Sequence, residues 1–136
     1  MQNDPVDPLE PLEGKTVLLA DDEERLRTVV EMMLEELGAR VVVVDGGQGA
    51  LDVFESDPEG FDLVMLDLRM QGVSGVDAFR RLRKTAPHVP VLLTSGAVPD
   101  DELLGELAAS GAGFLEKPFN VDRLGEVLRR LTSRDA

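Results

Sequence analysis

At 136 residues, with 43% hydrophobic and 30% charged residues, the chain fits one globular domain and has no room for two. Its formal net charge of -13 opposes binding to nucleic acid, because that affinity rests on Lys and Arg neutralising phosphates. Cysteine is absent, which excludes disulfides and thiolate metal sites, and no apolar run approaches the roughly 20 residues of a membrane span. We therefore expect a cytoplasmic domain without membrane contact, whose partners are proteins, cations or small molecules.

Residues 1–14 are a Pro-rich acidic leader in which an acid, a proline and an aliphatic residue repeat three times. A period of three matches polyproline II, so we interpret this segment as a linker. The alternative is that its aliphatic edge, formed by Val6, Leu9 and Leu12, docks on another surface. The domain itself is expected at residues 15–132, with a short tail at 133–136.

From Thr16 onward, short aliphatic runs alternate with amphipathic stretches. The runs predict strands at residues 16–20, 40–44, 63–67, 89–94 and 113–116. Apolar residues at steps of three and four predict helices around residues 26–37, 50–54, 78–82, 103–108 and 124–131. Strands that alternate with helices favour an α/β fold with a parallel, doubly wound sheet, whose functional crevice lies at the carboxyl ends of the strands.

Three acids fall at that edge. Asp21 and Asp22 directly follow the first strand, and Asp67 ends the third. If these strands are neighbours, the acids converge, and two carboxylates about 4 Å apart repel by roughly 4 kcal/mol at an effective dielectric constant of ~20. A hard cation such as Mg2+, which prefers oxygen ligands, would relieve that repulsion. The alternative for Asp21 and Asp22 is helix capping, which does not explain Asp67.

Two further strand ends complete the edge. Ser95 follows the fourth strand, and Lys117 follows the fifth. A hydroxyl and an ammonium are the groups that hold a phosphoryl on a carboxylate, because both donate to its oxygens. Taken singly, Ser95 could be a turn residue and Lys117 a surface charge, but four complementary strand ends favour a site.

The motifs "LLADDEE", "DLVMLDLRMQGVSG", "LLTSGA" and "GFLEKPF" occur in an order that resembles the receiver domain of two-component response regulators. The resemblance covers about residues 15–132. It implies a flavodoxin-like (βα)5 fold with a five-stranded sheet in the order 2-1-3-4-5. It also implies a phosphoacceptor signalling domain, which catalyses only its own Mg2+-dependent phosphorylation and dephosphorylation and is otherwise not an enzyme.

The resemblance assigns site roles residue by residue. The phosphoacceptor is Asp67. The other roles are Mg2+ binding by Asp21, Asp22, Asp67 and the backbone carbonyl of Arg69, phosphoryl contact by Lys117, and conformational switching by Ser95 and Phe114. We prefer Ser95 over Thr94 as the switch hydroxyl, since Thr94 would point to the opposite face. Many family members have proline where Gln71 stands, and the consequence of that departure does not follow from the sequence.

The resemblance also implies partners. A histidine kinase or histidine phosphotransfer domain would donate the phosphoryl group, and a homodimer could form through the fourth helix, fifth strand and fifth helix. The motifs are similar to those of C-terminal receivers in hybrid sensor histidine kinases, which we take as the origin. The alternatives are a stand-alone single-domain response regulator and an unphosphorylated protein-interaction module.

Two other classes share parts of this pattern. A Mg2+-dependent phosphatase with an aspartyl nucleophile would usually carry a second acid two residues later, where this chain has Arg69. A flavin-binding protein of the same fold would need aromatic residues to stack on the cofactor, and this chain has no Trp or Tyr. Both classes are disfavoured.

Overall fold

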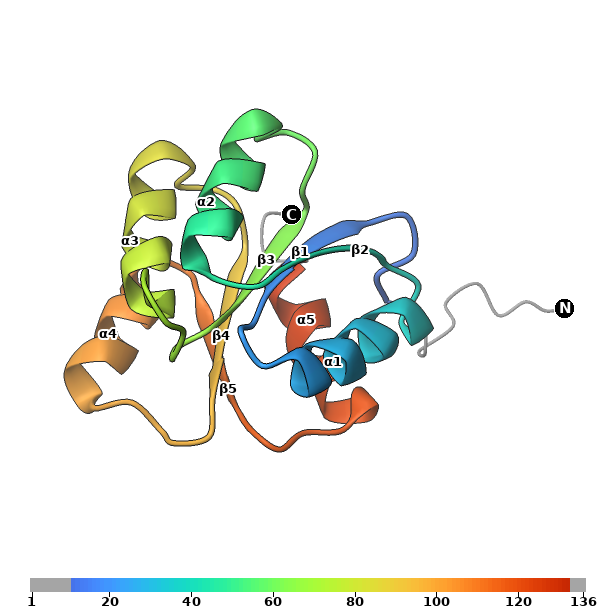
Figure 1. The fold of residues 1–136 in the computed structure, drawn as a ribbon. Coiled ribbons are helices and arrows are strands. Elements are labelled where there is room, and N and C mark those ends of the chain that lie inside the picture. The colour runs from blue at the N-terminus through green and yellow to red at the C-terminus, as the bar shows by residue number, and fades with distance from the viewer. Residues whose placement is uncertain (1–10, 133–136) are drawn as a thin grey trace, which may run out of the picture.

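A computed structural model describes residues 11–132, which form one parallel five-stranded sheet between two layers of helices (Figure 1). The strands are β1 (Thr16–Ala20), β2 (Arg40–Val44), β3 (Leu63–Asp67), β4 (Val91–Ser95) and β5 (Gly113–Glu116). The helices are α1 (Glu24–Glu36), α2 (Gly47–Ser56), α3 (Gly75–Thr85), α4 (Asp101–Ala109) and α5 (Val121–Thr132). The sheet order is β2-β1-β3-β4-β5, so the predicted fold class is confirmed.

Two hydrophobic cores lie on the two faces of the sheet. Alternation along β1 sends Val17 and Leu19 to the core under α1 and α5, and Leu18 and Ala20 to the core under α2, α3 and α4. Both faces of β1, β3 and β4 are therefore buried, which explains why these strands are almost continuously apolar. None of the helices described over residues 11–132 combines the length and the apolar character that a bilayer crossing requires.

The helix ends follow from particular residues. Ser74 caps α3, where its hydroxyl accepts from the N–H of Asp77 at 3.1 Å, and Asp100 caps α4 by accepting from the N–H of Leu103 at 2.9 Å. At the end of α1, Gly38 has a φ of 102°, a conformation that favours glycine. The chain thus leaves α1 at Gly38, directly after the helix predicted around residues 26–37.

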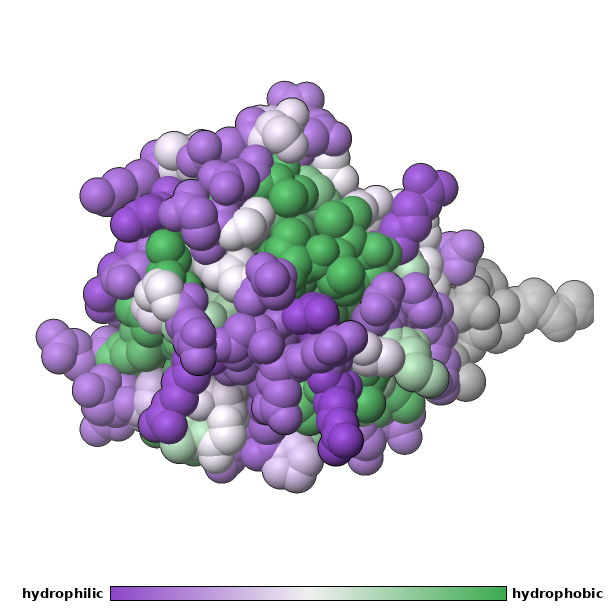
Figure 2. Space-filling model, in the orientation of Figure 1, coloured by the Kyte–Doolittle hydropathy of each residue, from purple (hydrophilic) through white to green (hydrophobic). Residues whose placement is uncertain are grey.

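Strand β2 is less covered than the other strands of the doubly wound sheet. It is an edge strand, and Val42 and Val43 are 37% and 38% exposed. Figure 2 shows hydrophobic surface in the region where β2 lies in Figure 1. Its run of four valines indicates a strand, but an apolar run alone cannot distinguish an edge strand from a central one. Strand β4 also differs, because it begins at Val91, after Pro90, and extends to Ser95.

The end of the leader packs against the domain. Leu12 is fully buried in the core under α1 and α5, and its N–H donates to the carbonyl of Leu37 at 3.0 Å. Leu12 therefore docks, as the alternative reading of the leader expects, whereas Val6 and Leu9 lie outside the described residues. The division of the chain at residue 15 and the tail at 133–136 stay predictions.

Candidate functional site

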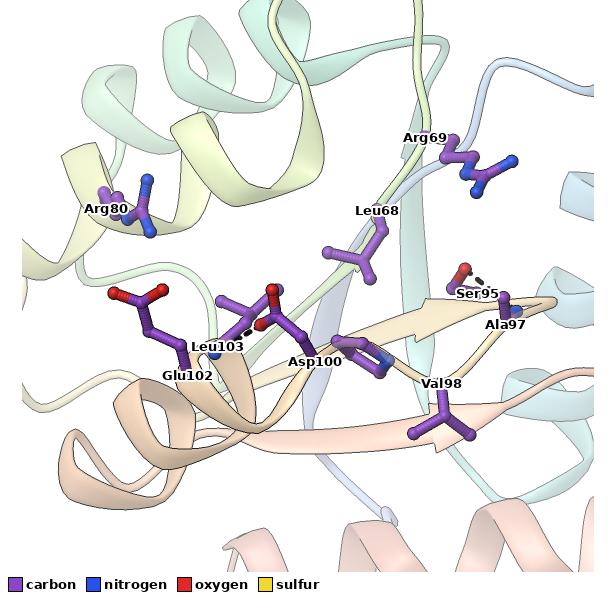
Figure 3. A pocket seen from close by; sticks show the side chains of 10 residues that line it. Leu68, Arg69, Arg80, Ser95, Ala97, Val98, Asp100, Glu102 and Leu103 are labelled. Carbon is purple, nitrogen blue, oxygen red and sulfur yellow. Dashed lines mark hydrogen bonds between the residues drawn. The ribbon is translucent and has the colours of Figure 1, made fainter.

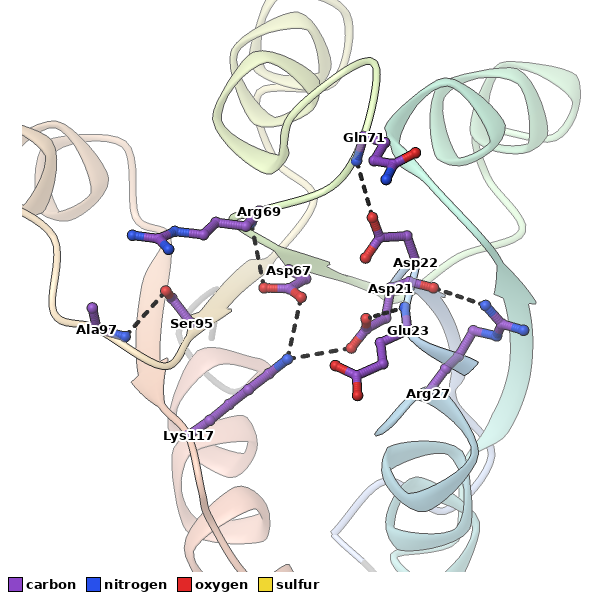
Figure 4. A network of polar contacts seen from close by, with 10 residues as sticks. All are labelled: Asp21, Asp22, Glu23, Arg27, Asp67, Arg69, Gln71, Ser95, Ala97 and Lys117. Carbon is purple, nitrogen blue, oxygen red and sulfur yellow. Dashed lines mark hydrogen bonds and ion pairs between the residues drawn. The ribbon is translucent and has the colours of Figure 1, made fainter. Parts of the chain in front are cut away.

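Four strand ends meet at the carboxyl edge of the sheet. Strand β3 lies between β1 and β4, and β5 pairs with β4, so residues that follow these strands share one edge. One carboxylate oxygen from each of Asp21, Asp22 and Asp67 lies within 4.8 Å of the others. Figure 4 shows the carboxylates of Asp21 and Asp67 facing Lys117, with Ser95 nearby, while the Asp22 carboxylate points toward Gln71. The residues predicted to converge are thus brought together.

Lys117 lies between two of the acids. Its Nζ is 3.3 Å from Asp21 Oδ2 and 3.2 Å from Asp67 Oδ2. Asp21 is buried, while the Asp67 side chain keeps 12% exposure at the rim. Burial raises the pKa of Asp67, the Lys117 ammonium opposes that increase, and the Asp21 carboxylate adds to it. Additional positive charge at the site would therefore stabilise the ionised form of the Asp67 carboxyl group.

The turn between β1 and α1 fixes Asp21 through two contacts. Its Oδ1 accepts from the N–H of Glu23 at 2.9 Å, and its backbone carbonyl accepts from the guanidinium of Arg27 at 2.8 Å. Sequence reasoning missed Arg27. Its position one helical turn into α1, on the side of the acidic pair, is the signal that could have identified it.

The chain after Asp67 is held close to the carboxylate. The N–H of Arg69 lies 3.4 Å from Asp67 Oδ1, and the N–H of Gly75 donates to the carbonyl of Leu68 at 3.0 Å. A Cβ atom on Gly75 would come within 2.2 Å of the Asp67 carbonyl oxygen, so this close approach requires glycine. Arg69 lines the same pocket as Asp67. It is the backbone N–H of Arg69 that lies beside the carboxylate, and metal binding by its carbonyl stays a prediction.

Asp22 is held from this loop. Its Oδ2 accepts a hydrogen bond from the backbone N–H of Gln71 at 3.0 Å (Figure 4). Gln71 is the position that departs from the proline of many family members, and proline has no N–H to donate. The contact was not predicted, since any residue except proline supplies the same donor.

Ser95 and Phe114 lie on one side of the sheet. Ser95 is buried, its Oγ accepts from the N–H of Ala97 at 3.2 Å, and it lines the pocket that contains Asp67 and Lys117. Phe114 pairs with Leu93 in the ladder and packs, partly exposed, on the core under α2, α3 and α4. By strand alternation Thr94 points to the other face, as expected.

A second hollow adjoins Ser95 on the side of α4 (Figure 3). Arg69, Ala97, Val98 and Leu103 are among the residues that line it. Close to it, α3 and α4 are connected by an exposed ion pair in which the guanidinium of Arg80 contacts both carboxylate oxygens of Glu106, at 2.8 and 2.7 Å. Ser95, one of the two residues predicted to switch, therefore borders a space beside α4.

An apolar groove adjoins the acids on the side of α1. It is lined by residues of α1 and of the segment after β5, among them Leu26, Val29, Met33 and Phe119. Leu26 and Val29 are 37% and 47% exposed, although the helical pattern placed them on the stripe expected to face the core. The apolar stripe of α1 is therefore wider than its buried part, because some of its residues line the groove and the others pack in the core.

The donor set suits a hard divalent cation. The three carboxylates are oxygen donors, and Mg2+ binds through one or two carboxylates together with waters and substrate oxygens. Because Lys117 offsets only part of the charge of three acids, a cation at this position is electrostatically favourable.

The family model for the response regulator receiver domain matches residues 17–129. Among curated proteins, the chain is 33% identical over 118 residues to the autoinducer 1 sensor kinase/phosphatase LuxN of Vibrio campbellii, covering 85% of this chain and 13% of LuxN. It is 35% identical over 119 residues to the transcriptional regulatory protein CpxR of Escherichia coli K12, covering 84% of this chain and 49% of CpxR. The chain thus spans half or less of the length of these relatives.

Solved structures give the same result. A receiver domain protein from Clostridium thermocellum has a TM-score of 0.82 at 24% identity, over 89% of this chain and 96% of that one, and supports the fold alone. The response regulator TrrA of Thermotoga maritima, solved in complex with Mg2+ and BeF, has a TM-score of 0.74 at 30% identity, over 86% of this chain and 98% of that one. With the family match across the folded part of the chain, these likenesses show that this chain belongs to the family of response regulator receiver domains.

Proposed function

We propose that Asp67 is the phosphoacceptor of a two-component phosphorelay. The observation that carries this proposal is the position of its carboxylate, which lies at the rim between the acidic pair and Lys117 with part of its surface open. An Asp67 oxygen attacks phosphorus in line, the new O–P bond forms as the P–N bond of a phosphohistidine breaks, and the electron pair leaves with the imidazole. The product is an aspartyl phosphate, and the domain is otherwise a signalling domain.

We propose that Mg2+ binds at Asp21, Asp22, Asp67 and the backbone carbonyl of Arg69. When bound, the ion offsets the negative charge on the phosphoryl oxygens. The cluster of three carboxylate oxygens supports this assignment, as does the Mg2+ complex of TrrA. Asp21 and Asp22 hold the site from β1 while Asp67 remains the group that reacts.

Lys117 and Ser95 complete the proposed chemistry. The ammonium of Lys117 already contacts Asp67 Oδ2, so it is placed to donate to a phosphoryl oxygen attached there. The Ser95 hydroxyl, which borders the same pocket, would donate to another oxygen and move inward. Phe114, on the same side of the sheet, would then follow into the vacated space and change the surface of α4 and β5.

The phosphodonor is proposed to dock on α1. A donor histidine must come within bonding distance of Asp67, and the apolar groove lined by Leu26, Val29 and Met33 is the hydrophobic surface beside that carboxylate. A helix of a histidine kinase or phosphotransfer domain fits such a groove through an apolar face. The chain's own histidine, His88, lies exposed in the loop before β4 and is not the donor in this scheme.

The decisive experiment is chemical phosphorylation. Incubation with Mg2+ and acetyl phosphate should add one phosphoryl group by intact mass, and beryllofluoride should give a bound fluorine signal. Asp67→Asn should abolish both, whereas Asp62→Asn, at an exposed acid before β3, should leave both intact. Equal modification of Asp67→Asn would refute the assignment.

The switch has a separate test. Ser95→Ala should leave phosphorylation largely intact, because Lys117 and Mg2+ still hold the phosphoryl group, but should weaken the conformational response. The readout is the change in backbone amide shifts of α4 and around Phe114 on adding beryllofluoride. If the amide shifts of Ser95→Ala changed as much as those of the wild type, Ser95 would not transmit the signal and would be only a turn residue.

The wider setting is also proposed. We infer that the domain acts in the cytoplasm as the receiver of a hybrid histidine kinase, which the likeness to LuxN supports, and that a homodimer forms through α4, β5 and α5. The stand-alone regulator is the alternative. A pure interaction module is disfavoured because Asp21, Asp22, Asp67, Ser95 and Lys117 are all in place. The reading frame on both sides of this segment distinguishes the first two.

A further inference from the structure

We propose that the backbone N–H of Gln71 positions Asp22 for cation binding. The N–H donates to Asp22 Oδ2 at 3.0 Å and connects residues 49 positions apart in the chain. The inference rests on the Mg2+ site of the proposed function and adds a positioning residue that acts through Asp22 without touching the metal or the phosphoryl group.

Asp22 needs such a contact more than its neighbours do. Asp21 is buried and is held by the N–H of Glu23, and Asp67 is held by Lys117. Asp22 is exposed, and within residues 11–132 the N–H of Gln71 is the one hydrogen-bond donor recorded for its carboxylate. Without that donor the side chain would be free to rotate in water, so binding a cation would cost additional side-chain entropy.

The loop that contains Gln71 is held in place by the residues on both sides of it. Met70, the preceding residue, is buried in the core under α2, α3 and α4. Gly72, the following residue, has a φ of 77° and turns the chain, and Gly75 packs against the carbonyl of Asp67. The direction of the Gln71 N–H is therefore set by the backbone on both sides, while its side chain is exposed.

The contact places Asp22 relative to Asp67 before any cation arrives. The loop begins at the end of β3, so a donor fixed to that strand holds a ligand that follows β1. One Asp22 oxygen is taken by the N–H, which leaves Oδ1 to face the cation. Hydrogen bonds to ligating carboxylates fix their orientation, and removing such a partner costs about 10- to 100-fold in metal affinity.

The test uses the fact that the donor is the backbone N–H of Gln71 and not its side chain. Gln71→Pro removes the N–H, and Gln71→Ala keeps it while removing the side chain. Mg2+ titrations followed by backbone amide shifts should give about a 10-fold weaker Kd for Gln71→Pro, the lower end of the range because both groups are exposed. Gln71→Ala should bind Mg2+ with a Kd within about twofold of the wild type. Equal affinities of the two variants would overturn the inference.

A second experiment controls for the possibility that proline weakens Mg2+ binding by distorting the loop. Replacing the peptide bond before Gln71 by an ester removes the N–H without restricting φ, and should weaken Mg2+ binding to the same extent. In the Mg2+-free wild type, a through-hydrogen-bond coupling between the Gln71 nitrogen and the Asp22 carboxylate carbon is expected, and its absence would overturn the inference. A wild type that binds no Mg2+ would instead refute the metal site of the proposed function, together with what rests on it.

Discussion

Replacing Lys117 by methionine tests whether this lysine stabilises the fold by offsetting the repulsion between Asp21 and Asp67. Its Nζ lies 3.3 Å from Asp21 and 3.2 Å from Asp67, and its side chain is only 17% exposed. Methionine keeps an unbranched apolar stem of similar length and removes the charge. The two carboxylates are then left facing each other, with oxygens within 4.8 Å.

The cost follows from that geometry. Two unit charges 4.8 Å apart repel by about 3.5 kcal/mol at an effective dielectric constant of ~20. Because Asp67 is partly exposed, solvent screens part of this repulsion, so we expect Lys117→Met to lose about 2 kcal/mol of unfolding free energy. Loss of a hydrogen bond to a charged group, about 1.5–3 kcal/mol, gives a similar magnitude.

The assay is urea unfolding at neutral pH with the divalent cations chelated. Lys84→Met, at an exposed lysine of α3, is the matched control and should stay within about 0.5 kcal/mol of the wild type. Adding Asp67→Asn to Lys117→Met removes one of the facing charges and should recover most of the loss, as should saturating Mg2+. A double variant as unstable as Lys117→Met alone would refute the reasoning.

Three further outcomes are expected. Because burial raises the pKa of Asp67 above its ordinary 3.8, the folded domain binds that proton more tightly than the unfolded chain does. Wild-type stability should therefore fall relative to Asp67→Asn as pH rises from 3.8 through the raised pKa, measured by urea unfolding without Mg2+. Arg27→Met should weaken Mg2+ binding severalfold in titrations, since the carbonyl of Asp21 loses its donor. Leu12→Ala should cost about 3 kcal/mol in urea unfolding, because its side chain is fully buried, whereas Leu26→Ala, in the exposed groove, should cost much less.

The convergence of the acids could be predicted because it depends on two simple regularities. Alternating apolar runs and amphipathic stretches indicate a parallel sheet, and every parallel strand ends at the same edge. Asp21 and Asp67 each follow an apolar run directly, and Lys117 follows the last predicted strand. Their convergence therefore required only that β1, β3 and the last strands lie close together in the sheet. The family resemblance supplied the strand order, which periodicity alone leaves open.

The supports of the site could not be predicted in the same way. The N–H groups of Glu23 and Gln71 belong to the backbone, and a backbone donor has no signature in the residue letter. In the sequence, Arg27 cannot be distinguished from the other charged residues of α1, because only the structure shows that it donates to the carbonyl of Asp21. The exposed residues Leu26 and Val42 read as core for the opposite reason, because an apolar pattern records hydrophobicity and not what covers it.

Helix α4 lies where the proposed switch would act. Helix α4 buries one side chain, Leu107, and has glycine at position 105 with no atom close to where a Cβ would stand. Helix α4 is attached through that leucine, the partly buried Leu103 and the exposed pairing of Glu106 with Arg80. Glycine inside a helix costs about 1 kcal/mol relative to alanine, so position 105 lowers the stability of the helix itself. Ser95 and Phe114 border this helix from the sheet. If a movement of the Ser95 hydroxyl toward Asp67 is transmitted to α4, Gly105→Ala should oppose that transmission by stabilising the helix.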